Sequence, residues 1–262
     1  MRRRNHLRRR DHYETENIMT TLGLIGSGAV GTSIARLAVA AGIDVIVSNS
    51  RGPETLEALV SELGKHARAG RSEEAARAGD VVVVTIPLGS IDALPVEALK
   101  GKVVLDTTNY YPGRDGQLAS LDDNSQTASE LVQSVLAESH VVKAFNSIGA
   151  AQIFTLARPT GASDRSALPI AGDNEEAKAV ASQLIDSLGY DTVDTGSLAD
   201  SWRSEPNTPV YVMPYLGAIP ESLDAAQWAD FFATTPGNSV SSTQVETLIA
   251  AAQRGKAGGE WA

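Results

Sequence analysis

Apolar and polar residues follow two alternating patterns along most of this chain. Short, nearly continuous apolar runs are typical of strands that are buried on both faces of a parallel sheet. Between these runs, apolar residues recur at positions i, i+3, i+4 and i+7, which is typical of amphipathic helices. The predicted strands span residues 21–25, 44–47, 66–69, 81–86, 103–106, 140–145, 167–171 and 190–193. The predicted helices span residues 29–41, 53–63, 73–78, 95–99, 150–156 and 174–188, and a further helix begins at the capping pair Thr127 and Glu130.

This alternation predicts an α/β fold with one doubly wound, mostly parallel sheet. We assign residues 19–196 to that domain, with a polar loop at residues 113–124. The last predicted helix of the domain is expected to bury Ala177, Val180, Ala181, Leu184 and Leu188.

The pattern changes after this domain. Residues 202–220 are rich in proline and aromatic residues, and helical patterns return at residues 223–232 and 245–253. We therefore expect residues 197–262 to form a partly helical C-terminal cap that closes a substrate cleft. The alternative is that its aromatic residues are simply part of the core, as most large aromatic side chains are.

Glycines mark the turn between the first predicted strand and the first helix. Gly26, Gly28 and Gly31 have the spacing G-x-G-x-x-G, and a second strand follows the helix at the expected distance. In a dinucleotide site, the first glycine permits a tight turn, the second lets a pyrophosphate approach the backbone, and the third lets the helix pack closely on the strand. The phosphates bind N–H groups at the start of the helix. The turn therefore predicts a Rossmann-type dinucleotide site.

The end of the second predicted strand indicates which dinucleotide is bound. NAD-selective sites usually place a carboxylate there for the ribose 2′-hydroxyl, whereas NADP sites offer cations and hydroxyl groups to the 2′-phosphate. This chain has Ser48, Asn49, Ser50 and Arg51 at that position, with no carboxylate among them. The sequence therefore favours NADP(H).

Composition excludes several other classes of function. Hydrophobic residues make up 42% of the chain and charged residues 21%, which is an ordinary balance for a soluble globular protein. No apolar run approaches the ~20 residues of a membrane span. Because the chain has no cysteine, a disulfide, a thiolate nucleophile and a cysteine-ligated metal are all excluded. We expect a cytoplasmic protein with no membrane partner and no metal.

The first eighteen residues differ in charge from the rest of the chain. They hold six arginines and carry a charge of +3, whereas the whole chain carries −10. The acidic body argues against nucleic-acid binding, and no apolar run of a secretory signal follows the arginines. We interpret residues 1–18 as a disordered basic extension, or as a segment upstream of a start at Met19.

The loops at the carboxyl ends of the predicted strands contain no histidine, lysine or cysteine. Reduction of a carbonyl compound needs a proton donor, for which Tyr110 and Tyr111 are the only candidates. Hydride exchange between two stacked rings needs mainly close approach in a dry slot. The loops therefore favour ring-to-ring hydride transfer without a dedicated acid or base.

Several segments together with the glycine turn resemble the NADPH-dependent reductases of the deazaflavin coenzyme F420. In that family NADP(H) and the deazaflavin exchange a hydride. The resemblance covers roughly residues 19–202. Besides the turn, its segments are SNSRGPETL from Ser48 to Leu56, VVVVTIPL from Val81 to Leu88, VVKAFNSIGA from Val141 to Ala150 and PIAGD from Pro169 to Asp173.

The resemblance implies two groups of binding residues and a homodimer, which is common among such reductases. The implied NADP(H) contacts are Gly26, Ser27, Gly28, Ala29, Val30, Gly31, Asn49, Ser50, Arg51, Ile86, Pro87 and Leu88, with Ser50 and Arg51 on the 2′-phosphate. The implied contacts of the second ring are Asn109, Asn146, Ser147, Ile148 and Gly149. A structural alternative for Asn146 is that it only satisfies backbone groups of its loop.

The chain departs from the family at three places, one of which is the tail beyond Trp202, where it has no match to the family. Glu54 and Thr55 stand where members often have a second cation, and residues 146–149 replace a His-Thr-Ile-Pro loop. The related reductase domains of membrane ferric reductases, which pass hydride to a flavin, have a Phe-Asn pair closer to Phe145 and Asn146. The second substrate is therefore expected to be coenzyme F420 or a flavin.

Two other functions remain open at this stage. One is an NADPH-dependent reductase of a small imine or carbonyl compound, with Tyr110 or Tyr111 as proton donor. The other is a non-catalytic NADP-binding sensor.

Overall fold

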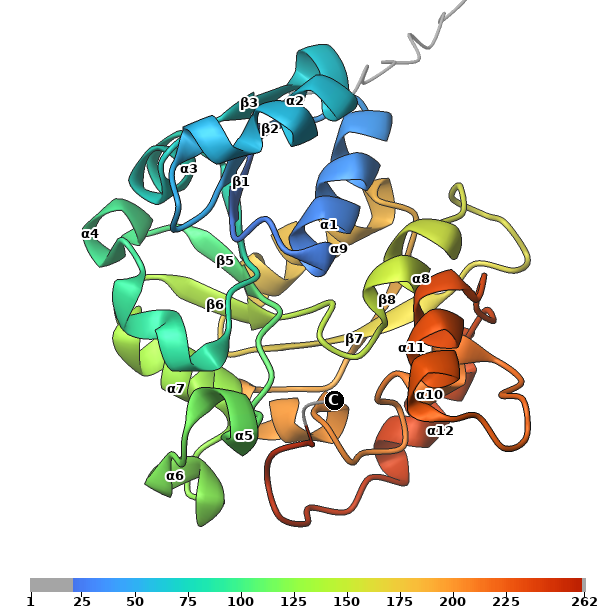
Figure 1. The fold of residues 1–262 in the computed structure, drawn as a ribbon. Coiled ribbons are helices and arrows are strands. Elements are labelled where there is room, and N and C mark those ends of the chain that lie inside the picture. Colours follow the sequence, from blue (N-terminus) through green and yellow to red (C-terminus); the bar gives the residue numbers. More distant parts are fainter. Residues whose placement is uncertain (1–20, 261–262) are drawn as a thin grey trace, which may run out of the picture.

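A sheet of eight strands organises residues 21–260, the part of the chain that the computed structural model describes (Figure 1). The strands are β1 (Thr21–Ile25), β2 (Asp44–Ser48), β3 (Ala67–Ala69), β4 (Val81–Val84), β5 (Val103–Asp106), β6 (His140–Lys143), β7 (Ala167–Gly172) and β8 (Asp191–Asp194). Their order is β3-β2-β1-β4-β5-β6-β7-β8, and only the β6–β7 pair is antiparallel. The predicted α/β fold is confirmed. The predicted extension at residues 1–18 lies outside the described residues.

Two strands end two residues earlier than the sequence predicts. The strand expected at residues 81–86 ends at Val84, because Thr85 turns toward the glycine loop and its hydroxyl donates to the Gly26 carbonyl. The strand expected at residues 140–145 ends at Lys143, and Phe145 has φ +56°, which a strand cannot accommodate. Both strands end where loops of the candidate site begin.

Helices and 3₁₀ turns connect the strands. The α-helices are α1 (Ala29–Ala40), α2 (Glu57–Leu63), α3 (Ser72–Ala78), α4 (Val96–Leu99), α5 (Pro112–Asp115), α6 (Ala119–Asp122), α7 (Ala128–Val135), α8 (Ala150–Thr155), α9 (Glu175–Ser187), α10 (Met213–Leu216), α11 (Ala225–Thr234) and α12 (Ser242–Ala250). The 3₁₀ helices are η1 (Pro53–Leu56), η2 (Gly64–His66), η3 (Leu88–Ala93) and η4 (Leu198–Ser204). The predicted capping box of Thr127 and Glu130 is present at the start of α7.

These helices cover both faces of the sheet and create two apolar layers. One layer contains buried residues of α1, α8 and α9, and the other contains buried residues of α3, α4 and α7. The central strand β4 contributes side chains to both layers, since Val81 and Val83 lie in the first layer and Val82 and Val84 lie in the second. Burial on both faces is the reason that this strand reads as a continuous apolar run.

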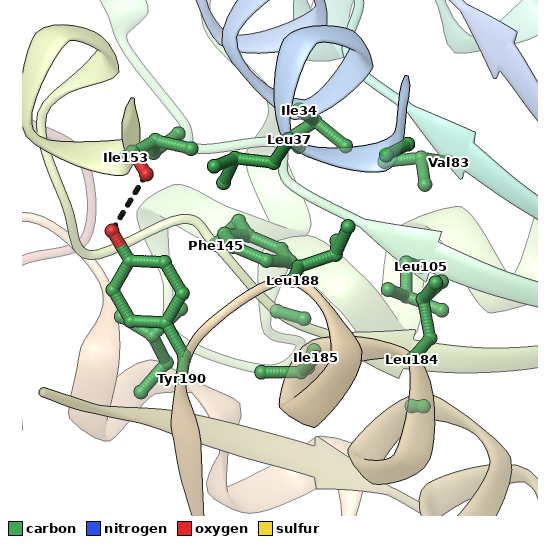
Figure 2. Packing of buried hydrophobic residues seen from close by; sticks show 14 of the residues in the cluster. Ile34, Leu37, Val83, Leu105, Phe145, Ile153, Leu184, Ile185, Leu188 and Tyr190 are labelled. Atoms are coloured by element: carbon green, nitrogen blue, oxygen red, sulfur yellow. Dashed lines mark hydrogen bonds between the residues drawn. The ribbon is translucent and has the colours of Figure 1, made fainter. Parts of the chain in front are cut away.

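The first layer fixes the end of β6 (Figure 2). The ring of Phe145 meets the ring of Tyr190 edge to face, with 6.1 Å between centroids. The Tyr190 hydroxyl donates to the carbonyl oxygens of Ile153, at 2.7 Å, and Gln152, at 3.0 Å. Ile34 of α1 and Leu188, which directly follows α9, pack around this pair. The loop that begins at Phe145 is therefore anchored in the core.

The structure corrects two local predictions. Residues 113–124 are not a loop throughout, because α5 begins with a proline at its first turn and α6 buries Leu121. Val180 is 37% exposed, since the buried side of α9 is formed by Ala177, Ala181, Leu184 and Ile185.

The C-terminal segment packs beside α8, β7 and β8 (orange to red in Figure 1). Val210, Tyr215, Val240 and Val245 join the first apolar layer, and the Tyr215 hydroxyl donates to the Ala167 carbonyl at 2.8 Å. The predicted helices of this segment are confirmed as α11 and α12, with shifted ends. A cleft-closing role stays a prediction.

Within residues 21–260, no helix combines the length and the apolar character that a membrane span requires.

Candidate cofactor and substrate site

The glycine turn lies at the carboxyl end of β1, which is the switch point of the sheet. Strands β2 and β3 lie on one side of β1, and β4 to β8 lie on the other. Gly26 has φ +114°, and a Cβ atom there would lie 2.5 Å from the Thr85 carbonyl oxygen. A Cβ atom on Gly31 would lie 2.3 Å from the Gly26 carbonyl oxygen. These two glycines are therefore required by the backbone itself.

Gly28 is different, because no atom of residues 21–260 requires a glycine there. It precedes α1 with φ −73°, which any residue can adopt, and a Cβ atom there would have no neighbour within 4 Å in this part of the chain. No side chain caps α1, and its first turn carries no acidic residue. Helix N-termini with free N–H groups bind phosphate. The open space over Gly28 therefore fits a pyrophosphate.

Asn49 shapes the loop that follows β2. Its Nδ2 donates to Ser27 Oγ at 3.2 Å and to Thr55 Oγ1 at 2.9 Å. Its Oδ1 accepts from the N–H groups of Arg51, at 2.9 Å, and Gly52, at 3.0 Å. Asn49 thus joins the loop to the glycine turn and holds Arg51 beside it.

Arg51 is exposed, and within residues 21–260 it forms no ion pair. The nearby Glu54 carboxylate lies over Gly52 instead, 2.4 Å from where a Cβ atom of that glycine would stand. Glu54 therefore does not neutralise Arg51 by direct contact. Ser50 is also exposed, so both residues predicted for the 2′-phosphate face solvent.

The loop after β4 carries the residues predicted to lie beside the nicotinamide. Ile86 is half-buried and Pro87 is exposed. Leu88 is completely buried in the second apolar layer, so its side chain faces away from any cofactor. Only its backbone can contribute to the predicted contact.

Asn109 and Asn146 form one hydrogen-bonded unit at the ends of β5 and β6. Asn109 Nδ2 donates to the Asn146 carbonyl at 2.9 Å, and Asn146 Nδ2 donates to Asn109 Oδ1 at 3.2 Å. Asn146 Nδ2 also donates to the Ser204 carbonyl at 2.8 Å. Asn146 therefore ties these two loops to η4.

The residues after Asn146 lie below the surface. Ser147 and Gly149 are buried, and the Ile148 side chain joins the first apolar layer. A Cβ atom on Gly149 would lie 3.2 Å from the ring of Phe232 in α11. The side chains predicted to contact a second ring are thus mostly occupied by contacts within the protein.

The two candidate proton donors occupy different environments. Tyr110 is 1% exposed, and its hydroxyl donates to Asp122 Oδ1 and accepts from the Leu118 N–H. This excludes Tyr110 as a donor to substrate. Tyr111 is half-buried, and its hydroxyl is hydrogen-bonded to the hydroxyl of Tyr211. Burial raises the pKa of both Tyr111 and Tyr211.

Asp115 connects the nicotinamide loop to Tyr111. Its buried carboxylate accepts from the N–H groups of Tyr111, at 2.9 Å, and Gly89, at 3.2 Å. Arg114 Nε lies 2.8 Å from the same carboxylate. Burial by itself raises the pKa of Asp115, but the Arg114 guanidinium and the two N–H groups outweigh burial and lower it. Asp115 is therefore a charged anchor between two loops of the site.

A buried charge cluster lies below these loops, and sequence reasoning missed it. Lys143 and Asp106 are both fully buried, with 3.4 Å between Nζ and Oδ2. Lys143 also donates to the Thr108 carbonyl, and Ser129 Oγ donates to Asp106 at 2.6 Å. The sequence feature that could have indicated this cluster was Lys143, a lysine within a largely apolar strand. Tyr211, which is also a new site residue, gave no local signal.

Comparison with known proteins finds one matching family model and several similar proteins. Residues 21–110 match the model of the family described as NADP oxidoreductase, coenzyme F420-dependent. The metalloreductase STEAP3 of Rattus norvegicus is 31% identical over 196 residues, which are 74% of this chain and 37% of that protein. The F420-dependent NADP reductase of Methanocaldococcus jannaschii is 32% identical over 150 residues, which are 54% of this chain and 64% of that protein. The chain therefore spans less than two thirds of the length of either relative.

A solved structure supports the fold independently. The structure of a hypothetical protein from Sinorhizobium meliloti has a TM-score of 0.66 and 29% identity, and it covers 74% of this chain and 94% of its own. The resemblance predicted from the sequence is confirmed by the family match. The matched region contains the glycine turn, Arg51 and Pro87 but ends before Asn146.

Proposed function

From its resemblance to the coenzyme F420-dependent NADP oxidoreductases, we propose that this chain is an NADPH-dependent reductase that transfers a hydride between NADP(H) and a deazaflavin or flavin ring. The observation that carries the proposal is the open space over Gly28, at the uncapped start of α1 and beside the loop of Arg51. Within the described residues, the protein's own packing does not explain the lack of a side chain there. A pyrophosphate does explain it.

The residues of the turn have distinct roles in this proposal. Gly26 and Gly31 keep the backbone tight, so that the first N–H groups of α1 face the phosphates. Arg51 and Ser50 hold the 2′-phosphate, and Asn49 positions them. Ile86 and Pro87 provide an apolar surface for the nicotinamide, which supplies the hydride when bound.

The second ring lies above the loop that joins β6 to α8. Asn109 and Asn146 fix this loop, and the buried residues 147–149 exclude water beneath it. A deazaflavin is the first candidate because the family and one relative are named for coenzyme F420. A flavin is the second candidate, supported by the resemblance of Phe145 and Asn146 to the ferric reductase domains and by the similarity to a metalloreductase.

The alternatives have less support. Reduction of an imine or carbonyl compound needs a proton donor, and Tyr110 is unsuitable because it is buried against Asp122. A non-catalytic sensor would rely on the arginine-rich residues 1–18, which lie outside the described part of the chain. We retain a homodimer and a cytoplasmic location as parts of the proposal. Light scattering of the purified protein tests the dimer.

Steady-state assays test the proposed reaction. The protein is mixed with NADPH and, in separate experiments, with oxidised coenzyme F420, flavin mononucleotide or a cyclic imine. We expect bleaching of the deazaflavin or the flavin together with equimolar loss of NADPH. Turnover of the imine alone would favour the alternative reductase. Binding of NADPH without any turnover would favour the sensor.

A further inference from the structure

Two tyrosine hydroxyl groups meet between the halves of the proposed site. Tyr111 lies in the loop after β5, and Tyr211 comes from the C-terminal segment, 100 residues later in the chain. Their hydroxyl groups are hydrogen-bonded to each other, and both side chains are half-buried. The pair therefore brings a polar group from the C-terminal segment to the carboxyl edge of the sheet.

Hydrogen bonds tie this pair to both predicted ring sites. The Asp115 carboxylate accepts from the N–H groups of Tyr111 and Gly89, which fixes Tyr111 to the nicotinamide loop. On the other side, the N–H of Val212 donates to the Ser147 carbonyl at 2.8 Å. Tyr211 is thereby fixed to the loop proposed for the second ring. Tyr111 and the residue after Tyr211 are thus each linked by hydrogen bonds to a segment that we assign to one of the two rings.

Unfavourable backbone conformations occur at the same place. Val212, which directly follows Tyr211, has φ +57°, and Phe145, which directly precedes Asn146, has φ +56°. A left-handed conformation is strained for a β-branched or bulky residue, and such residues cluster at binding sites where the surroundings enforce them. The strained residues beside Tyr211 and Asn146 therefore indicate that both segments are held in place for binding, at a cost in local stability.

The number of hydroxyl hydrogens in the pair determines whether it can donate a hydrogen bond to a ligand. Two phenol groups have two hydrogens, and the bond between them uses one. Either hydroxyl group can donate within the pair, and in the arrangement in which Tyr111 donates, the hydrogen of Tyr211 is available to an acceptor outside the pair. Burial raises the pKa of both phenols, so they remain protonated at neutral pH. Tyr211 is therefore suited to donating a hydrogen bond and poorly suited to giving up its proton.

We propose that Tyr211, held in place by Tyr111, donates a hydrogen bond to a ring nitrogen or carbonyl oxygen at the polar edge of the hydride-accepting ring. Tyr211 is then a specificity-determining residue that favours a deazaflavin or flavin over a ring without polar edge atoms. This inference rests on the proposed function. It adds a residue from the C-terminal segment to a site whose other parts come from the sheet.

Binding measurements with phenylalanine variants test the proposal. Tyr211→Phe keeps the ring and removes only the hydroxyl group. We expect the dissociation constant of oxidised coenzyme F420 or flavin mononucleotide, measured in the presence of NADP⁺, to rise about 3- to 10-fold. Tyr111→Phe should have a smaller effect in the same direction, because the Tyr211 hydroxyl then loses the hydrogen bond that positions it. The dissociation constant of NADPH should stay the same in both variants.

Tyr110→Phe is the matched control, because it removes a neighbouring hydroxyl that faces Asp122 in the core. An unchanged acceptor affinity in Tyr211→Phe, or an equal loss in the Tyr110→Phe control, would overturn the inference. If the wild type still reduces the acceptor in that case, the proposed function stands without it. If the wild type binds NADPH but neither acceptor, the proposed function fails and the inference fails with it.

Discussion

Single residues in the glycine turn act through different physical constraints. Gly26 and Gly31 are fixed by close backbone approach, whereas Gly28 has open space above it. Arg51 is exposed and lies at the end of a loop that Asn49 shapes with four hydrogen bonds. These differences allow the cofactor contacts to be tested one at a time.

Replacing Gly28 with alanine should affect binding and leave folding intact. The added methyl group meets no atom of residues 21–260, and φ −73° suits alanine. It occupies the space proposed for the pyrophosphate, so we expect the dissociation constant of NADPH to rise at least ~10-fold, as about 1.4 kcal/mol of lost binding free energy implies. Fluorescence titration measures the affinity, and urea unfolding checks that stability is unchanged. Normal NADPH affinity would contradict the assignment of this space.

Replacing Arg51 with alanine should distinguish NADPH from NADH. A charged hydrogen bond to the 2′-phosphate contributes about 1.5–3 kcal/mol, so we expect NADPH to bind roughly 10- to 100-fold more weakly. NADH has no 2′-phosphate and should be almost unaffected. The control is Arg77→Ala, which removes an exposed arginine that lies in α3, away from the loop of Arg51. Equal losses for both dinucleotides would disprove the role of Arg51.

At the scale of elements, helix α1 and strands β1 and β4 form the rigid base of the site. Gly31 lets the first turn of α1 approach the Gly26 carbonyl, and the Thr85 hydroxyl donates to the same carbonyl from the end of β4. The sequence predicted β1, β5 and the glycine turn well, because long-range packing only reinforced their local patterns. It failed at residues 113–124, where single-turn helices depend on contacts with Tyr110 and Gly89.

Replacing Gly31 with alanine should destabilise the protein. Its Cβ atom would lie 2.3 Å from the Gly26 carbonyl oxygen, so α1 must shift away from β1. Overpacking of this kind costs about 1–3 kcal/mol. The urea midpoint should fall clearly below that of the wild type, while Gly28→Ala serves as the control for a glycine in the same turn. Wild-type stability of the Gly31 variant would contradict the close packing.

At the scale of the whole molecule, a buried polar cluster joins the sheet to α7 and the C-terminal segment. Lys143 and Asp106 lie at the ends of β6 and β5, and the buried Glu205 follows η4. Glu205 Oε1 accepts from the Ala128 N–H at 3.1 Å. Burial raises the pKa of Glu205, although Lys143 and this N–H oppose the shift. The contribution of Glu205 to stability is therefore expected to vary with pH.

The raised pKa of Glu205 predicts a pH-dependent effect of Glu205→Gln. The folded state binds this proton more tightly than the unfolded state, so the contribution of Glu205 to stability is present at low pH and lost as pH rises. Glutamine does not titrate. The stability of the variant relative to the wild type should therefore increase as pH rises from about 4.3 toward neutral. Urea midpoints at several pH values measure this difference, with the exposed Glu246→Gln as control. A difference that is flat or falls with pH would contradict the prediction.

The sequence by itself determined the alternation of elements, the glycine turn and the preference for NADP, because each depends on residues that are close together in the chain. Tertiary structure decided which side chains lie around the site that we propose for the second ring. Asn146 bonds to Asn109 and Ser204, Tyr110 is buried, and Tyr111 meets Tyr211. These contacts join segments that lie far apart in sequence. Local patterns therefore carry no record of them, and only the folded chain shows which side chains remain available to a substrate.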